Sequence, residues 1–155
     1  DVLFEAGLSD RREQNLSINI EIDANPPAGW VEEKTIINIH MPVLIRHYDK
    51  PSVFAAKCAA FLTRPYTKGR DAYDLFWLRS KWKDLRPNFD LLNNALRQKI
   101  KKPEIVAENN WLEVMATKAA KLNWRTVEQD VAPFLEDLRE AATLTKENFL
   151  LLYSK

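Results

Sequence analysis

The hydrophobic pattern of the chain changes its period near residue 50, and this change constrains the fold more than any other feature. Before that point apolar and polar residues tend to alternate, as in β-strands with one covered face. After it apolar residues recur every three or four positions, as in helices packed against a core. The sequence therefore predicts an α+β fold, with a small, mostly antiparallel sheet in residues 1–50 followed by a helical domain of about six helices in residues 51–155.

Strands are expected over residues 16–23, 35–40 and 43–48, and residues 2–4 are a candidate for a further short strand. The first segment alternates strictly, so Glu21 and Asp23 project from one polar face. A turn with two prolines at residues 25–29 separates this segment from the other two long strands.

Helices are expected from residue 51 to a break at Pro65, and over residues 70–82, 88–99, 108–122, 126–142 and 145–153. The helix over residues 70–82 is apolar on nearly all sides, which predicts a buried, central helix. Thr126 followed by Gln129 matches a capping box, and Thr145 with Asn148 gives a second cap signal.

The charges of the chain nearly balance, with 23 basic and 22 acidic residues and a net charge of +1. This balance gives no overall attraction to nucleic acid or to an anionic membrane. The single cysteine excludes an internal disulfide framework and a cysteine-rich zinc site, and no apolar run reaches the ~18–20 residues of a membrane helix. We therefore expect a protein of the reducing cytoplasm, and the first residue, Asp1, leads us to expect a processed product or a part of a longer protein.

Charged residues interrupt the two most apolar helices, between Lys57 and Leu78. Lys57 lies at the edge of an apolar stripe, where its ammonium would reach either solvent or a nearby carboxylate. Asp71 and Asp74 are three residues apart and share a helix face with packed residues. From spacing alone, Asp71 fits a simple interaction with the helix N-terminus, and Asp74 fits either a structural ion pair or a catalytic role.

Two other places have residue types that can bind a metal ion or a phosphate. Glu21 and Asp23 could hold Mg²⁺ or act as a general base, although a solvated strand face accounts for the same alternation. The loop 65–69 leads into a helix N-terminus and carries Lys68, with Arg70 directly after it. Such a loop could bind phosphate, although an ordinary solvated turn is the alternative.

Three sequences carry a resemblance to a known family: NIEIDANPPAGW at 19–30, AAKCAAFLTR at 55–64 and YTKGRDAYDLFWL at 66–78. Together they resemble the AbiEii/AbiGii toxin family of nucleotidyltransferases, which is associated with bacterial abortive infection and toxin–antitoxin systems. The similarity runs from about residue 18 to the C-terminus. It implies a polymerase-β-like core, represented here by a partial sheet in residues 1–50, followed by a helical domain in residues 51–155.

The resemblance also implies roles for particular residues, which follow from the motifs that match. The implied catalytic residues are Glu21, Asp23, Lys57, Asp71 and Asp74, and the implied phosphate-binding residues are Lys57, Lys68 and Arg70. The family's first motif, a Gly-Ser turn followed by paired acids that hold the metal-bound nucleotide, has no counterpart before Leu16. We therefore expect Mg²⁺ in the intact family enzyme, with Glu21 or Asp23 as the possible ligands from this chain, and no activity from this chain alone.

The function implied by the resemblance is transfer of a nucleotide from an NTP to an RNA or protein acceptor, with an antitoxin as a possible partner and no membrane. One alternative is a non-catalytic relative that binds nucleotide, RNA or protein, because Asn19 and Ala56 stand where relatives often have lysine and glutamate. A second alternative is a structural domain with paired charges and no ligand.

Overall fold

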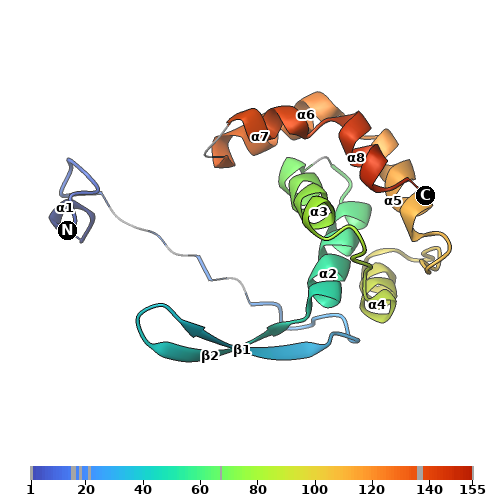
Figure 1. Cartoon of the computed structure of the whole chain (residues 1–155), viewed down its shortest axis with the longest axis horizontal. Helices are drawn as coiled ribbons and strands as arrows, with labels where there is room; N and C mark the ends of the chain where they lie inside the picture. The colour runs from blue at the N-terminus through green and yellow to red at the C-terminus, as the bar shows by residue number, and fades with distance from the viewer. Residues whose placement is uncertain are drawn as a thin grey trace.

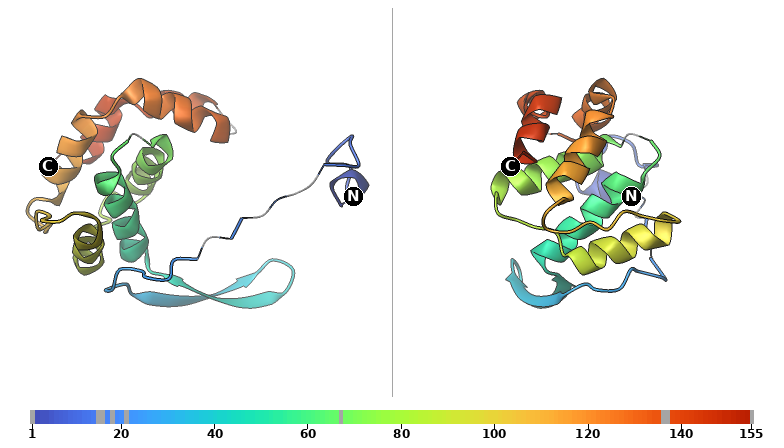
Figure 2. Two further views of the ribbon diagram at one scale, coloured as in Figure 1. Left: turned by 180° about the vertical axis from the view of Figure 1, so that it is seen from behind. Right: turned by 90° about the vertical axis from the view of Figure 1, so that its right-hand side faces the viewer.

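The computed structural model describes residues 2–14, 17, 19–20, 22–66, 68–135 and 138–154. Its elements follow one another in the order α1 (Val2–Glu5), β1 (Glu32–Asn38), β2 (Pro42–Tyr48), α2 (Lys50–Thr63), α3 (Gly69–Lys81), α4 (Phe89–Lys99), α5 (Trp111–Ala120), α6 (Trp124–Val131), the 3₁₀ turn η1 (Ala132–Phe134), α7 (Leu138–Thr143) and α8 (Lys146–Leu152). The helices from α2 onward form one body, the β-hairpin lies on one side of it, and α1 lies apart from both (Figure 1, Figure 2). The predicted α+β class is confirmed.

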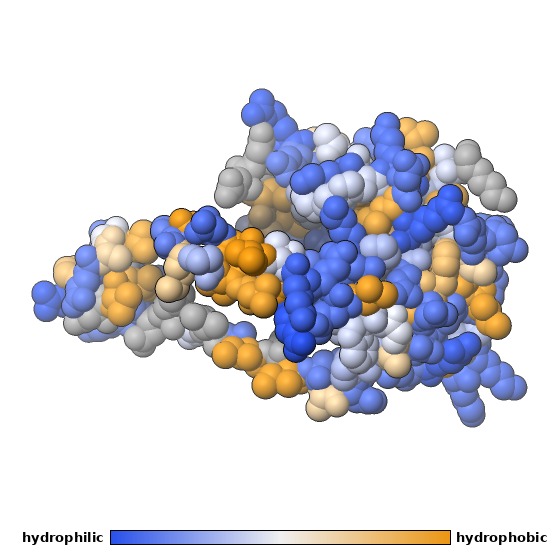
Figure 3. Space-filling view, turned by 60° about the horizontal axis from the view of Figure 1, so that its bottom comes forward, coloured by the Kyte–Doolittle hydropathy of each residue, from blue (hydrophilic) through white to orange (hydrophobic). Residues whose placement is uncertain are grey.

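In the described part of the chain, β1 and β2 form a two-stranded sheet in antiparallel register. Ile36 faces Leu44, and Ile37 faces Val43 on the opposite side of the hairpin. All four side chains are exposed, and apolar side chains reach the surface in the view from the hairpin side (Figure 3). The distal half of the hairpin is thus apolar on both faces, a pattern typical of strands that are covered on both sides.

Two of the strand predictions at the N-terminal end are wrong for the residues that the structure describes. Residues 2–4 belong to α1, because without a neighbouring strand their carbonyls accept local bonds, such as that from the Ala6 amide to Val2. In residues 16–23, the described residues form no strand, and Ile20 and Ile22 are 82% and 87% exposed. Residues 16, 18 and 21 of that segment lie outside the described residues.

The core surrounds α2 rather than α3. Phe54, Ala55 and Cys58 are fully buried, and α2 packs against α3, α4 and α5. The sequence predicted α3 as the central helix, but its exposed side includes Trp77, whose side chain is 44% accessible. The difference arises because α2 carries small residues that let three helices approach it, whereas the large aromatic residues of α3 cannot all fit in one core.

An aromatic cluster joins the end of the chain to the central helix. Phe149 stacks on both Phe61 and Tyr153, with ring centroids 5.7 and 4.8 Å apart, and Trp111 contacts Tyr153 edge-on. The guanidinium of Arg79 lies 5.3 Å from the Trp111 ring centroid and donates to three backbone carbonyls, those of Lys83, Leu85 and Leu152. Helices α3, α5 and α8 are therefore held together at one end of the body.

Ser52 connects the segment before the hairpin to the helices. Its buried hydroxyl accepts a hydrogen bond from the Val31 amide at 3.0 Å and one from the Asn88 side chain at 3.1 Å. The Asn88 side chain also donates to the Gly29 carbonyl. Gly29 has φ +103°, and a Cβ there would lie 3.0 Å from the Leu91 amide nitrogen, so both its conformation and its space require glycine.

The long helix predicted over residues 126–142 is divided into α6, η1 and α7. Pro133 ends α6 because it has no amide to donate to the carbonyl four residues earlier. The predicted cap at Thr126 is wrong: the Asn123 side chain accepts from the Thr126 amide and is itself the cap. The cap at Thr145 is confirmed, since its hydroxyl accepts from the Asn148 amide. Each helix in the described part of the chain is too short or too polar to span a bilayer.

Candidate functional site

Helices α2 and α3 run in opposite directions and exchange charged contacts along one seam. Lys57 Nζ lies 2.6 Å from Asp74 Oδ2, and Arg64 Nε lies 2.5 Å from Asp71 Oδ2. At the other end of the seam, Lys50 Nζ lies 4.9 Å from the centroid of Trp82, the residue that follows α3. Lys50 and Lys57 of α2 and Arg64, the residue that follows the helix, are seven positions apart, which places them on one side. We call this contact line the α2–α3 seam.

The Lys57–Asp74 pair is open to solvent on one side. The two side chains are 42% and 36% exposed, so their attraction is screened. Pairs of this exposure contribute about 0.2–1 kcal/mol to stability. The sequence left open whether Asp74 has an ion-pair partner or a catalytic role, and the structure shows that it has the partner.

The Arg64–Asp71 pair is the buried member of the seam. The Asp71 residue is only 7% exposed, and burial raises the pKa of its carboxyl group, against the lowering effect of Arg64. The contact is an ion pair without an aligned hydrogen bond. Lys118 of α5 donates to the Arg64 backbone carbonyl, so this position also joins a third helix. Asp71 therefore supports the α2–α3 packing directly, a role that spacing did not predict.

The N-terminus of α3 is occupied by a side chain of the protein. The Gly69 amide donates to Asp130 Oδ2 at 2.7 Å, and a Cβ on Gly69 would lie 2.3 Å from the Val127 carbonyl oxygen. This amide lies in the loop that the sequence marked as a candidate phosphate-binding loop. It is bound to a carboxylate of the protein itself. Lys68 is half-buried directly before it, whereas Arg70 lies over the ring of Phe134 in η1 at 4.5 Å rather than in the seam.

Of the two predicted strand acids, the structure describes only Asp23, and it does not bring Asp23 to the seam. Glu21 lies outside the described residues. Asp23 accepts a hydrogen bond from the Asn25 amide and lines a cavity of about 440 Å³ between α2 and α4. Ala56, the neighbour of Lys57 in the chain, also lines this cavity. Asp23 therefore faces the same helix as the seam but on a different side.

The described residues do not fit a magnesium site. Within the described ranges, no group of three His, Cys, Asp or Glu residues is placed to hold a metal ion. Asp71 and Asp74 each face a basic side chain, whose positive charge opposes binding of a metal ion at the same carboxylate. Among the described residues Asp23 belongs to no such group, and Glu21 lies outside them.

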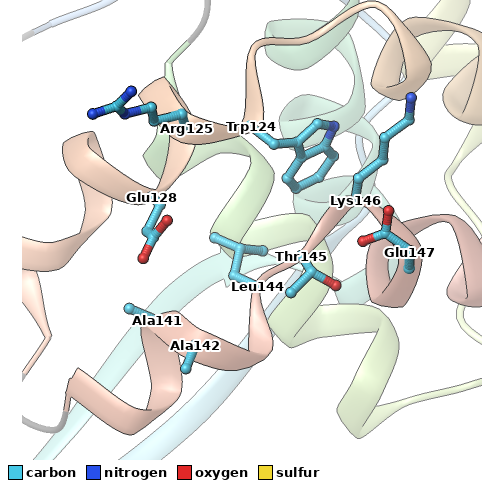
Figure 4. Close-up of a pocket in the computed structure, with 9 residues that line it drawn as sticks. All are labelled: Trp124, Arg125, Glu128, Ala141, Ala142, Leu144, Thr145, Lys146 and Glu147. Carbon is cyan, nitrogen blue, oxygen red and sulfur yellow. The ribbon is translucent and has the colours of Figure 1, made fainter.

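A second cavity, which the sequence did not predict, lies between α6, α7 and α8 and has a volume of about 600 Å³ (Figure 4). Trp124 and Leu144 line its apolar part, and Arg125, Glu128 and Lys146 stand at its sides. The opposite charges around it do not select one class of ligand.

The comparisons with known proteins identify the family of the chain. No curated protein and no solved structure gives a significant match to the chain. The family model described as "Nucleotidyl transferase AbiEii toxin, Type IV TA system" matches residues 2–147, which include the hairpin, the seam and both cavities. Because this match covers nearly the whole chain, the protein belongs to the AbiEii nucleotidyl transferase toxin family.

Proposed function

We propose that the α2–α3 seam binds the phosphates of an NTP during transfer of a nucleotide to an RNA or protein acceptor. The protein would act in the bacterial cytoplasm as the toxin of a toxin–antitoxin pair, in defence by abortive infection, and an antitoxin would be its protein partner. Membership of the AbiEii family supports the general activity. The choice of this seam rests on the geometry of Lys57.

Lys57 is the observation that supports the proposal most. Its ammonium is held at 2.6 Å by Asp74 while 42% of its side chain remains exposed. Because such a pair contributes no more than about 1 kcal/mol to stability, the fold does not depend on it. A triphosphate carries more negative charge than one carboxylate and would compete for this ammonium. Asp74 would then fix the direction of the lysine before the nucleotide binds.

The other charged residues would support Lys57 in this proposal. Lys68 and Arg70 would extend the positive charge beyond the seam, since phosphoryl and nucleotidyl transfer depend on charge neutralisation and positioning. Asp71 would act through Arg64, by fixing the packing of α2 against α3. We infer that the carboxylates that hold Mg²⁺ in the family enzyme lie outside the described residues. We therefore expect the chain alone to bind nucleotide without turnover.

A non-catalytic binding protein is the second candidate function. It is favoured by the pairing of Asp71 and Asp74 with cations, which leaves the described residues without a metal-binding set. Both candidates predict nucleotide binding by this chain. They differ only in whether a nucleotide is transferred by the longest natural form of the protein.

Transfer can be tested with each labelled NTP and Mg²⁺ in the presence of total RNA and a candidate protein acceptor. The chain and the longest natural form are compared, each with Lys57→Gln and with the exposed control Lys101→Gln. Transfer by the longest form that Lys57→Gln abolishes and Lys101→Gln preserves supports the enzyme. Binding without transfer in every form supports the second candidate, and transfer that does not respond to Lys57→Gln contradicts the assignment of the seam.

A further inference from the structure

Two tryptophans and two lysines gather at the C-terminal end of α3. Trp77 and Trp82 contact each other edge-on, with ring centroids 5.6 Å apart. The Lys81 ammonium lies 4.8 Å from the Trp77 centroid and 5.0 Å from that of Trp82, and Lys50 covers Trp82 from α2. We call these four residues the aromatic platform. Trp77 stays 44% exposed, so the described part of the chain does not use its ring fully for packing.

The platform continues the α2–α3 seam. Asp74, Trp77 and Lys81 follow one another at intervals of three and four residues and share one face of α3. On α2, Lys50 and Lys57 are two helical turns apart on one side. A linear ligand that contacts the platform can therefore run along both helices toward the Lys57–Asp74 pair.

We propose that the aromatic platform binds single-stranded nucleic acid, with a base stacked on Trp77 and the adjoining phosphates on Lys81 and Lys50. Aromatic rings beside lysines are the usual construction of such surfaces, because every base has a flat face and every linkage has a negative charge. The proposal deepens the proposed function, because it identifies the acceptor as a nucleic acid that reaches the seam. In that respect it rests on the proposed function.

The charges favour nucleic acid over a protein partner. The centres of protein interfaces are depleted in lysine, whereas here lysines cover both indole rings. Residues 79–83 contain three basic residues and no acid, and Asp84 follows them. Arg79 is already engaged in the core, so Lys81 and Lys83 are the side chains of this stretch that are free to face a phosphate backbone.

The test is fluorescence anisotropy with labelled 12-residue oligonucleotides, without NTP or Mg²⁺, at a series of salt concentrations. Oligouridylate, oligodeoxythymidylate and a duplex of the same length are compared. We expect Trp77→Leu to weaken binding of the single strands about 5- to 150-fold and Trp77→Phe to retain most of it, since stacking contributes about 1–3 kcal/mol per base. Lys81→Gln should lower the slope of log K against log salt by about 0.7.

Two matched controls make this result specific. Phe4→Leu removes another exposed ring, which the Arg12 guanidinium covers. Phe4 belongs to α1, which lies away from the platform. Lys101→Gln removes an exposed positive charge elsewhere. Both should leave the affinity within about twofold of that of the parent chain, because neither touches the platform. Thermal unfolding of each variant verifies folding, and if Trp77→Leu does not fold, Trp77→Phe and Lys81→Gln decide the result.

Several outcomes would overturn the proposal: no single-strand binding, binding that Trp77→Leu or Lys81→Gln leaves unchanged, or duplex binding as tight as that of single strands. A protein partner that requires Trp77, together with no oligonucleotide binding, would also overturn it. Binding of oligouridylate alone, or of both oligouridylate and oligodeoxythymidylate, agrees with the proposal. Since no NTP is present, these outcomes are separate from failure of nucleotide binding at Lys57.

Discussion

Replacing Gly69 by alanine should separate the two helices that meet at the start of α3. The added Cβ would lie 2.3 Å from the Val127 carbonyl oxygen, 2.9 Å from a methyl group of Val131 and 3.0 Å from the Asp130 Cβ. The nearest of these atoms belongs to the backbone of α6, so a side-chain rotation cannot relieve the contact. Helix α6 must move away, and the bond from the Gly69 amide to Asp130, now 2.7 Å, must lengthen.

The size of the effect follows from these contacts. Overpacking of a tight site costs about 1–3 kcal/mol. Weakening a hydrogen bond to a charged acceptor adds up to about 1.5–3 kcal/mol. The higher helix propensity of alanine returns about 1 kcal/mol at most. We therefore expect a loss of about 2–4 kcal/mol in the free energy of unfolding, and a fall in melting temperature of roughly 5–15 °C for a chain of this size.

Urea denaturation followed by circular dichroism measures this loss directly. Asp130→Ala removes the acceptor without the steric contact and should cost about 1.5–3 kcal/mol, as for other hydrogen bonds to a charged group. The double variant Gly69→Ala/Asp130→Ala should cost less than the sum of the two, because both changes act on one hydrogen bond. A loss below about 0.5 kcal/mol for Gly69→Ala would refute this account of the α3–α6 contact.

Three further predictions concern the charged residues. Burial raises the pKa of Asp71 in the folded state, so the contribution of Asp71 to the free energy of unfolding falls as pH rises through that pKa. Asp71→Asn should therefore gain stability relative to the parent chain between pH 4 and pH 7. Urea denaturation at each pH measures this difference. A double-mutant cycle of Lys57→Ala and Asp74→Ala should give a coupling energy of about 0.2–1 kcal/mol, and a value above 2 kcal/mol would mean a structural pair. Arg79→Lys should lower the melting temperature and increase amide exchange in α8, because lysine cannot reach the Leu152 carbonyl and its other acceptors together.

The periodicity of the sequence predicted most of the helices and the hairpin, and the reasons for the failures are local. Helix α4 begins directly after Asn88, as expected, because its apolar face and its cap agree. The alternation in residues 16–23 predicts a strand only if another strand pairs with it, and no described segment does so. Pro133 was visible in the predicted helix over 126–142, but the strength of the flanking pattern concealed the break.

The sequence predicted the charged residues of the α2–α3 seam, but not every contact that they make. The charged residues at 57, 71 and 74 were evident from their apolar surroundings, and the Lys57–Asp74 pair follows from two helices in contact. The partner of Asp71 is Arg64, which lies at the end of α2, where spacing cannot show which way a long side chain turns. Asp130 is 61 residues from Gly69 in the chain, so only the tertiary structure reveals its contact.

Equilibrium binding of a labelled NTP to the chain, with Lys57→Gln and Lys101→Gln as the test and control variants, examines the central claim most directly. The parent chain should bind, and Lys57→Gln should weaken binding about 10- to 150-fold, the equivalent of one hydrogen-bonded contact to a charged group. Lys101→Gln should bind like the parent chain, because it removes the same charge away from the seam. Equal affinity of the parent chain and Lys57→Gln would contradict the claim that the α2–α3 seam holds the phosphates.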